Sequence, residues 1–128
     1  MSEESLANNK RMTMYIIVNQ SLNMPSGKMA SQVAHVVQMV THHIVTEIYE
    51  NMSLPKYCLD YEKWRENPIT VVLGSKGHNF DKLLKLENAT YFVDKGRTTQ
   101  NTSDQITAIA FYPCDTLDNF FASYDLLD

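Results

Sequence analysis

The sequence predicts an α/β sandwich, in which helices cover both faces of a single sheet. Short apolar runs rich in β-branched residues alternate along the chain with segments of helical periodicity, and turn-forming residues separate them. The chain has 128 residues, 44% hydrophobic and 20% charged, which is the composition of one globular domain with its own core. We therefore expect residues 12–128 to form a single domain after a flexible, polar tail at residues 1–11.

Four apolar runs are expected to be strands, because each is short and bounded by turn residues. They are Met12–Asn19, Ile69–Gly74, Thr90–Val93 and Ile106–Tyr112. Helical segments join the first three runs, so these strands should be parallel. A polar loop without a helix joins the third run to the fourth, so the fourth strand should be antiparallel to the others.

The longest helical segment is expected at Ser26–Glu50, with the hydroxyl of Ser26 capping its N-terminus. Its apolar residues recur at helical spacing and form one broad face, which comprises Met29, Val33, Val36, Val37, Val40, Ile44 and Ile48. Shorter helices are expected at Tyr57–Arg65, Phe80–Leu86 and Leu117–Tyr124. The order of strands and helices is therefore that of an α/β sandwich.

Three polar residues of the long helix, Lys28, Gln32 and His35, form a stripe within about 60° of one another. We expect the stripe to lie opposite the apolar face, and such a stripe is usually only the solvent-facing side of a helix. In open α/β sheets, however, ligands bind beyond the carboxyl ends of the parallel strands. Two polar segments, Gln20–Lys28 and Asp94–Gln100, follow strand ends at that edge, which makes it the candidate site.

The cysteines, the histidines and the N-terminus indicate which metals and locations to expect for this chain. Cys58 and Cys114 fit no metal-ligand spacing and are expected to be free thiols in a reducing compartment. His42 and His43 have no carboxylate or cysteine at useful spacing, so we expect no metal. The N-terminus is acidic, unlike a signal or transit peptide, and no apolar run approaches the roughly 20 residues of a membrane helix. We expect a cytoplasmic protein without a membrane partner.

Charge limits the ways in which this chain could bind nucleic acid. The formal net charge is −4, so the molecule as a whole does not attract a polyanion. Binding of RNA would need a local basic patch. We expect that patch at the same edge of the sheet, from Lys28, Lys76, Lys95 and Arg97.

Four segments together resemble the type 2 peptidyl-tRNA hydrolases of archaea and eukaryotes. Asn23–His35 (NMPSGKMASQVAH) is similar to the family motif K-M-G-K-G-K-[IVM]-A-A-Q-C-[SA]-H, and Trp64 precedes the second strand as the family's tryptophan does. Asp94–Gln100 (DKGRTTQ) resembles D-x-G-R-T-Q with one extra threonine. Thr107–Pro113 (TAIAFYP) resembles T-V-L-A-I-G-P, and the resemblance extends over residues 12–124.

The resemblance implies a hydrolase that cleaves the ester between a peptide and the 3′ ribose of tRNA, with peptidyl-tRNA as partner and no cofactor. It implies a three-layer α/β/α sandwich around a mixed four-stranded sheet, with the last strand antiparallel. Whether the chain forms a homodimer stays open. The implied catalytic residues are Lys28, His35, Asp94 and Thr107, and the implied substrate-binding residues are Gln32, Lys95, Arg97, Thr98, Thr99 and Gln100.

These residue types suit ester hydrolysis, which needs an oriented water, a base, and positive charge where the oxyanion develops. Asp94 is the candidate to orient or deprotonate the water. Lys28 is the candidate to stabilise the oxyanion and to keep Asp94 ionised. His35 is expected to orient neighbours or to contact the substrate. No Ser-His-Asp arrangement is readable, so a covalent acyl-enzyme is not favoured.

The chain departs from the family pattern in two loops. Asn23 and Pro25 stand where the family usually has lysine and glycine, and Ser26 replaces a second lysine. Residues 102–105 (TSDQ) lack the Pro-Gly that commonly precedes the last strand. Fewer phosphate-binding lysines would weaken tRNA affinity. The alternative is therefore a non-catalytic family member that binds tRNA or a protein partner.

Overall fold

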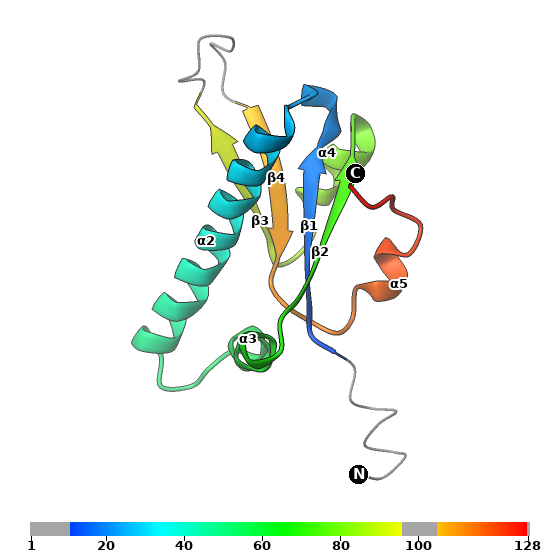
Figure 1. Cartoon of the computed structure of the whole chain (residues 1–128). Coiled ribbons are helices and arrows are strands. Elements are labelled where there is room, and N and C mark those ends of the chain that lie inside the picture. The colour runs from blue at the N-terminus through cyan, green and yellow to red at the C-terminus, as the bar shows by residue number, and fades with distance from the viewer. Residues whose placement is uncertain (1–10, 96–104, 128) are drawn as a thin grey trace.

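The computed structural model describes residues 11–95 and 105–127 and contains one four-stranded sheet with helices on both faces (Figure 1). The strands lie in the order β2-β1-β4-β3. Their bounds are β1 (Thr13–Asn19), β2 (Ile69–Ser75), β3 (Ala89–Asp94) and β4 (Gln105–Phe111). β1 is parallel to β2, whereas β4 is antiparallel to both β1 and β3. The predicted mixed sheet with an antiparallel last strand is therefore confirmed.

The helices lie close to their predicted positions, with differences at their ends. They are α2 (Ser26–Glu50), α3 (Lys56–Glu66), α4 (His78–Leu83) and α5 (Asp118–Phe121), and a 3₁₀ turn, η1 (Gln20–Leu22), follows β1. α2 and α3 match the predicted ranges to within one residue at each end. α4 and α5 end earlier than predicted, because bonds between residues three apart replace the α-helical pattern, as in Leu86 N to Leu83 O and Tyr124 N to Phe121 O.

The prediction that Ser26 caps α2 is wrong. Ser26 is the first helical residue, and the cap position belongs to Pro25, whose backbone is extended and whose side chain makes no capping hydrogen bond. Proline holds its φ near −65°, so it sets the entry into the helix through backbone geometry rather than through a hydroxyl.

Two hydrophobic clusters, one on each face of the sheet, make the three layers. α2 and α3 cover the first cluster, which includes Met14 and Ile16 of β1. α4 and α5 cover the second, which includes Tyr15 and Ile17 of the same strand. Because neighbouring side chains of a strand point to opposite faces, a strand buried on both sides needs a continuous apolar run, as β1 has. In the described part of the chain, no helix is long and apolar enough to cross a membrane.

The two edges of the sheet differ. The C-terminal segment lies along β2: the amide of Leu127 donates to the carbonyl oxygen of Val72 at 3.1 Å, and the amide of Gly74 donates to that of Asp125 at 3.1 Å. At the opposite edge, β3 pairs with β4, and no other described strand pairs with it. The polar segments of α2 and β3 meet near this second edge.

Candidate active site

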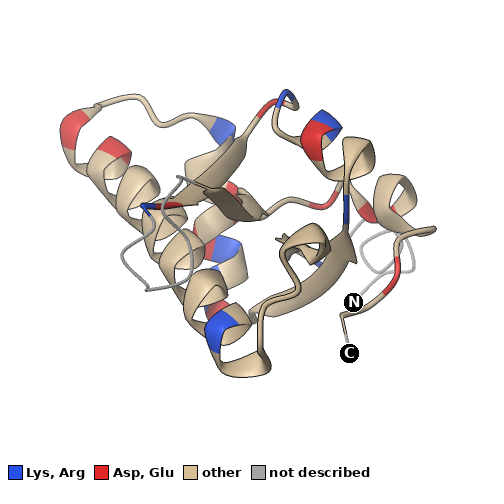
Figure 2. Ribbon diagram, turned by 90° about the horizontal axis from the view of Figure 1, so that it is seen from above, with Lys and Arg blue, Asp and Glu red and all other residues tan. Residues whose placement is uncertain are grey.

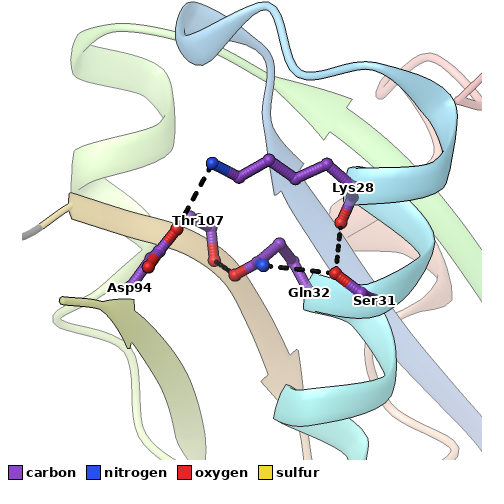
Figure 3. Close-up of polar contacts among 5 residues, drawn as sticks. All are labelled: Lys28, Ser31, Gln32, Asp94 and Thr107. Atoms are coloured by element: carbon purple, nitrogen blue, oxygen red, sulfur yellow. Dashed lines mark hydrogen bonds and ion pairs between the residues drawn. The ribbon is translucent and has the colours of Figure 1, made fainter. Parts of the chain in front are cut away.

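Lys28 and Asp94 form an ion pair between two elements that are far apart in the sequence (Figure 3). Lys28 lies in the first turn of α2, and Asp94 is the last residue of β3. Lys28 Nζ is 3.4 Å from Asp94 Oδ2, and the two side chains are only 26% and 19% exposed. Partial exclusion of water makes such a pair interact more strongly than a fully exposed one.

A buried hydrogen bond joins β4 to α2 beside this pair. The hydroxyl of Thr107 donates to Gln32 Oε1 at 2.7 Å, and Thr107 is only 1% exposed (Figure 3). Gln32 Nε2 donates to Ser31 Oγ at 3.3 Å, and Ser31 Oγ donates to the carbonyl oxygen of Lys28 at 2.9 Å. This chain of contacts ties the backbone of Lys28 to β4 and orients the first turns of α2.

A β-bulge explains why Thr107 points toward α2. Phe92 lies opposite Ala108 and Val93 lies opposite Ile106, so Thr107 is the extra residue of β4. Ala108 packs in the cluster under α2, whereas Ile106 packs against the cluster on the other face. Regular alternation from Ala108 would have placed Thr107 on that other face and Ile106 on the face of α2. The bulge reverses the alternation and directs the hydroxyl to Gln32.

The expectation that the polar stripe of α2 lies opposite the apolar face is only partly met. Gln32 is buried, with 6% exposure, one turn before buried Val36. His35 is exposed, but its ring stacks on Phe92 of β3, with ring centroids 4.7 Å apart. The expectation fails because β3 and β4 extend along this side of α2, so the helix contacts the sheet over a wider arc than its apolar residues indicate.

The structure brings together Lys28, Gln32, Asp94 and Thr107, with His35 one turn further along α2 and exposed Lys95 next to Asp94. The remaining predicted site residues, Arg97, Thr98, Thr99 and Gln100, lie outside the described residues.

Sequence reasoning missed a contact that holds the start of β4. Asn19 Nδ2 donates to the carbonyl oxygen of Ile106 at 3.0 Å, directly before Thr107. Asn19 is the last residue of β1, and a polar residue that closes an apolar run was the available signal. It anchors the bulge from the neighbouring strand, since β1 pairs with β4.

The described residues include no cluster of metal ligands, and the two thiols of the chain are free. Among residues 11–95 and 105–127, no three His, Cys, Asp or Glu side chains are grouped as metal ligands would be. Cys58 and Cys114 are free cysteines, as predicted. Burial raises the pKa of the Cys58 thiol, which keeps it protonated and unreactive.

The fold and this arrangement define an α/β/α sandwich protein with polar side chains converging from a helix N-terminus and two strands. The family model for peptidyl-tRNA hydrolase PTH2 matches residues 12–127. The chain therefore belongs to the PTH2 family of peptidyl-tRNA hydrolases, and the resemblance to the type 2 enzymes is confirmed. A search of curated proteins found no match.

Proposed function

We propose that this protein hydrolyses the ester bond of peptidyl-tRNA and releases free tRNA and peptide. The observation that carries the proposal is the Lys28–Asp94 pair, which joins two separate elements in a member of the PTH2 family. A carboxylate and an ammonium group at one partly shielded position can supply the base and the positive charge that favour hydrolysis of an ester by water. As a translation-related activity on a tRNA substrate, this reaction takes place in the cytoplasm.

In the proposed reaction, Asp94 orients a water and accepts one of its protons as the oxygen attacks the ester carbonyl carbon. Lys28 stabilises the negative charge that develops on the carbonyl oxygen. The bond to the 3′ oxygen of the ribose then breaks, and that oxygen takes up the proton held by Asp94, which restores the carboxylate. The partial positive charge at the N-terminus of α2 adds to the stabilisation of the oxyanion.

Thr107 and Gln32 act as positioning residues in this proposal. Their 2.7 Å hydrogen bond and the contact of Ser31 with the carbonyl of Lys28 support the turn of α2 that carries Lys28. A catalytic group displaced by a fraction of an ångström loses much of its effect. His35, exposed beside Phe92, contacts the substrate rather than the reacting atoms.

Contacts with the RNA are few in this proposal. Lys28, Lys95 and Lys76, which directly follows β2, lie at the end of the sheet where β2 and β3 finish, and Arg97 lies outside the described residues. Figure 2 looks onto this end of the molecule and shows the Lys and Arg positions of the described residues as separate blue segments of the ribbon. We expect a shallow dependence of tRNA binding on salt, because few phosphates are neutralised. A steep dependence in binding titrations would contradict this.

The test is single-turnover hydrolysis of N-acetylated aminoacyl-tRNA by excess protein, followed by release of the labelled amino acid. Release well above the rate without protein is expected. Retention of bound, intact substrate would instead support the non-catalytic alternative, which the replacement of two family lysines by Asn23 and Ser26 favours. Measuring binding and release on the same samples separates the two outcomes.

A further inference from the structure

β3 presents an open edge next to the candidate active site. The sheet ends at β3, and in the described part of the chain no strand or terminal segment covers its outer side. The opposite edge is covered by the C-terminal segment that bonds to Val72 and Gly74. Natural proteins usually cover, shorten or charge an open edge, because its free backbone groups pair readily with another chain.

The hydrogen-bond pattern shows which backbone groups of β3 face outward. The amide of Tyr112 donates to the carbonyl oxygen of Asn88, which makes these opposed residues a hydrogen-bonded pair. In an antiparallel ladder such pairs alternate with non-bonded ones. Ala89 and Tyr91 are therefore in the non-bonded positions, and their N–H and C=O groups point away from β4.

A groove of about 570 Å³ runs along this edge between β3 and α2. Met39 and His43 of α2 form one wall, and β3 from Ala89 to Val93 forms the other. Lys95 lies at the end near Asp94, and Tyr112 lies at the far end. The residues that line it are mostly apolar, and none of the described ones is acidic.

We infer that this groove binds the peptide part of peptidyl-tRNA as an added strand parallel to β3. The inference rests on the proposed function. If Asp94 activates the attacking water, the ester must lie at Asp94, where β3 ends. The ester is at the carboxyl end of the peptide, so a peptide that lies along the groove runs in the same direction as β3.

Main-chain pairing suits a substrate whose side chains vary. Strand addition recognises the backbone, while pockets for alternate side chains add only modest preference. Side chains on one side of the added strand contact Met39 and Phe92, and those on the other side lie near Tyr91, which is 43% exposed. The apolar lining accepts many residue types, and only groups near Lys95 experience a strong charge.

The length of β3 sets the number of peptide residues that the groove holds. β3 has six residues, so it spans about 17 Å, and an added strand of about five residues fills it. The effect of peptide length on hydrolysis should therefore stop at about five residues. The experiment uses N-acetylated substrates with one to seven amino acids on the same tRNA.

For the unmodified protein, we expect KM to fall about tenfold between one and five residues and then to stay constant. Tyr91→Pro removes an outward N–H and leaves the pairing with β4 intact, as proline on an edge strand can. It should lower the preference for the five-residue substrate over the one-residue substrate about fivefold. Tyr91→Ala, which keeps the N–H, should lower this preference less. Thermal melts check that both variants fold.

The outcomes separate the inference from the proposed function. Hydrolysis that does not depend on peptide length overturns the inference and leaves the proposed function standing, while no hydrolysis of any substrate overturns both. A folded Tyr91→Pro variant with the full length preference places the peptide elsewhere and overturns the inference. Length independence together with a dimer that Tyr91→Pro dissociates, seen by light scattering, would assign the edge to a second copy of the chain.

Discussion

Two lysine–aspartate ion pairs lie at opposite ends of the sheet, and the chain builds them differently. Lys56 and Asp60 are one turn apart on α3, and their charged atoms are 2.9 Å apart. Lys28 and Asp94 belong to α2 and β3, and their charged atoms are 3.4 Å apart. The side chain of Lys56 is 74% exposed, whereas that of Lys28 is 26% exposed.

The shorter ion pair is therefore not the better candidate for chemistry. The hydrogen bond with Asp60 raises the pKa of Lys56, and this local pair stabilises α3 in the way that charges one helical turn apart do. The longer pair forms only when α2 and β3 meet, and the bond between Thr107 and Gln32 supports it from a third element. Convergence of separate elements on one partly shielded position is what a reaction site needs.

The largest expected effect comes from Asp94→Asn. This change removes the carboxylate and keeps its shape, so ester hydrolysis should fall by about a thousandfold or more. Asp60→Asn, the same change in the local pair, should leave the rate unchanged. Hydrolysis of N-acetylated aminoacyl-tRNA measures both, and thermal melts exclude unfolding. A fully active Asp94→Asn would show that another group acts as the base.

Lys28→Ala should lower the rate by about a hundredfold, because it removes the positive charge beside the oxyanion. Lys56→Ala is the matched control and should cost about 1 kcal/mol of unfolding free energy at most, as exposed pairs do, with no loss of rate. Urea unfolding and initial rates measure the two quantities. Equal losses of rate in both variants would remove the distinction between the pairs.

Thr107→Val should lower the rate by about tenfold, because it removes the hydroxyl that positions Gln32. It should also destabilise the fold by about 1–3 kcal/mol, since Gln32 Oε1 loses its buried donor. Thr13→Val changes a buried threonine at the far end of β1 and should leave the rate unchanged. An unaltered rate for a folded Thr107→Val would show that the bulge has no part in positioning the site.

The smallest effect on hydrolysis is expected from Tyr15→Phe, which changes stability and its dependence on pH at a position away from the candidate site. Burial and the hydrogen bond to Asp118 raise the pKa of Tyr15 to about 12, from about 10 in the unfolded chain. Because the folded state holds the proton more tightly, this stabilisation is complete below pH 10. It is lost between pH 10 and 12 and amounts to about 3 kcal/mol.

Urea unfolding of the two proteins between pH 9 and 12 tests this expectation. The unmodified protein should lose more unfolding free energy over that interval than Tyr15→Phe does. Parallel curves for the two proteins would contradict it. The rate of hydrolysis near neutral pH should be the same in both, since Tyr15 and Asp118 lie on the face of the sheet away from α2.

The strands, the long helix and the direction of β4 were predictable from the sequence. Buried strands need continuous apolar runs, and a connection without a helix forces antiparallel pairing. The ends of the helices were less predictable: Ser26 is a good capping residue in general, but Pro25 occupies the position where a cap would act. Local preference there gives way to the backbone geometry of the preceding turn.

That Lys28 and Asp94 lie close together was predictable from the sequence, whereas the geometry around them was less so. The positions of Lys28 and Asp94 follow from the topology, since both lie near the ends of parallel strands. The direction of the Thr107 side chain does not, because a bulge depends on how β3 pairs with β4 and leaves no mark in the periodicity. The burial of Gln32 was missed for a related reason, since it depends on a polar partner from another strand.

The most direct test of the account is a double-mutant cycle between Lys28 and Asp94, read by single-turnover hydrolysis of N-acetylated aminoacyl-tRNA. If the two residues act on the same water and oxyanion, the double variant Lys28→Ala, Asp94→Asn should be no slower than Asp94→Asn alone. Losses of rate that multiply in the double variant would contradict the account, because they would show that the two residues act independently.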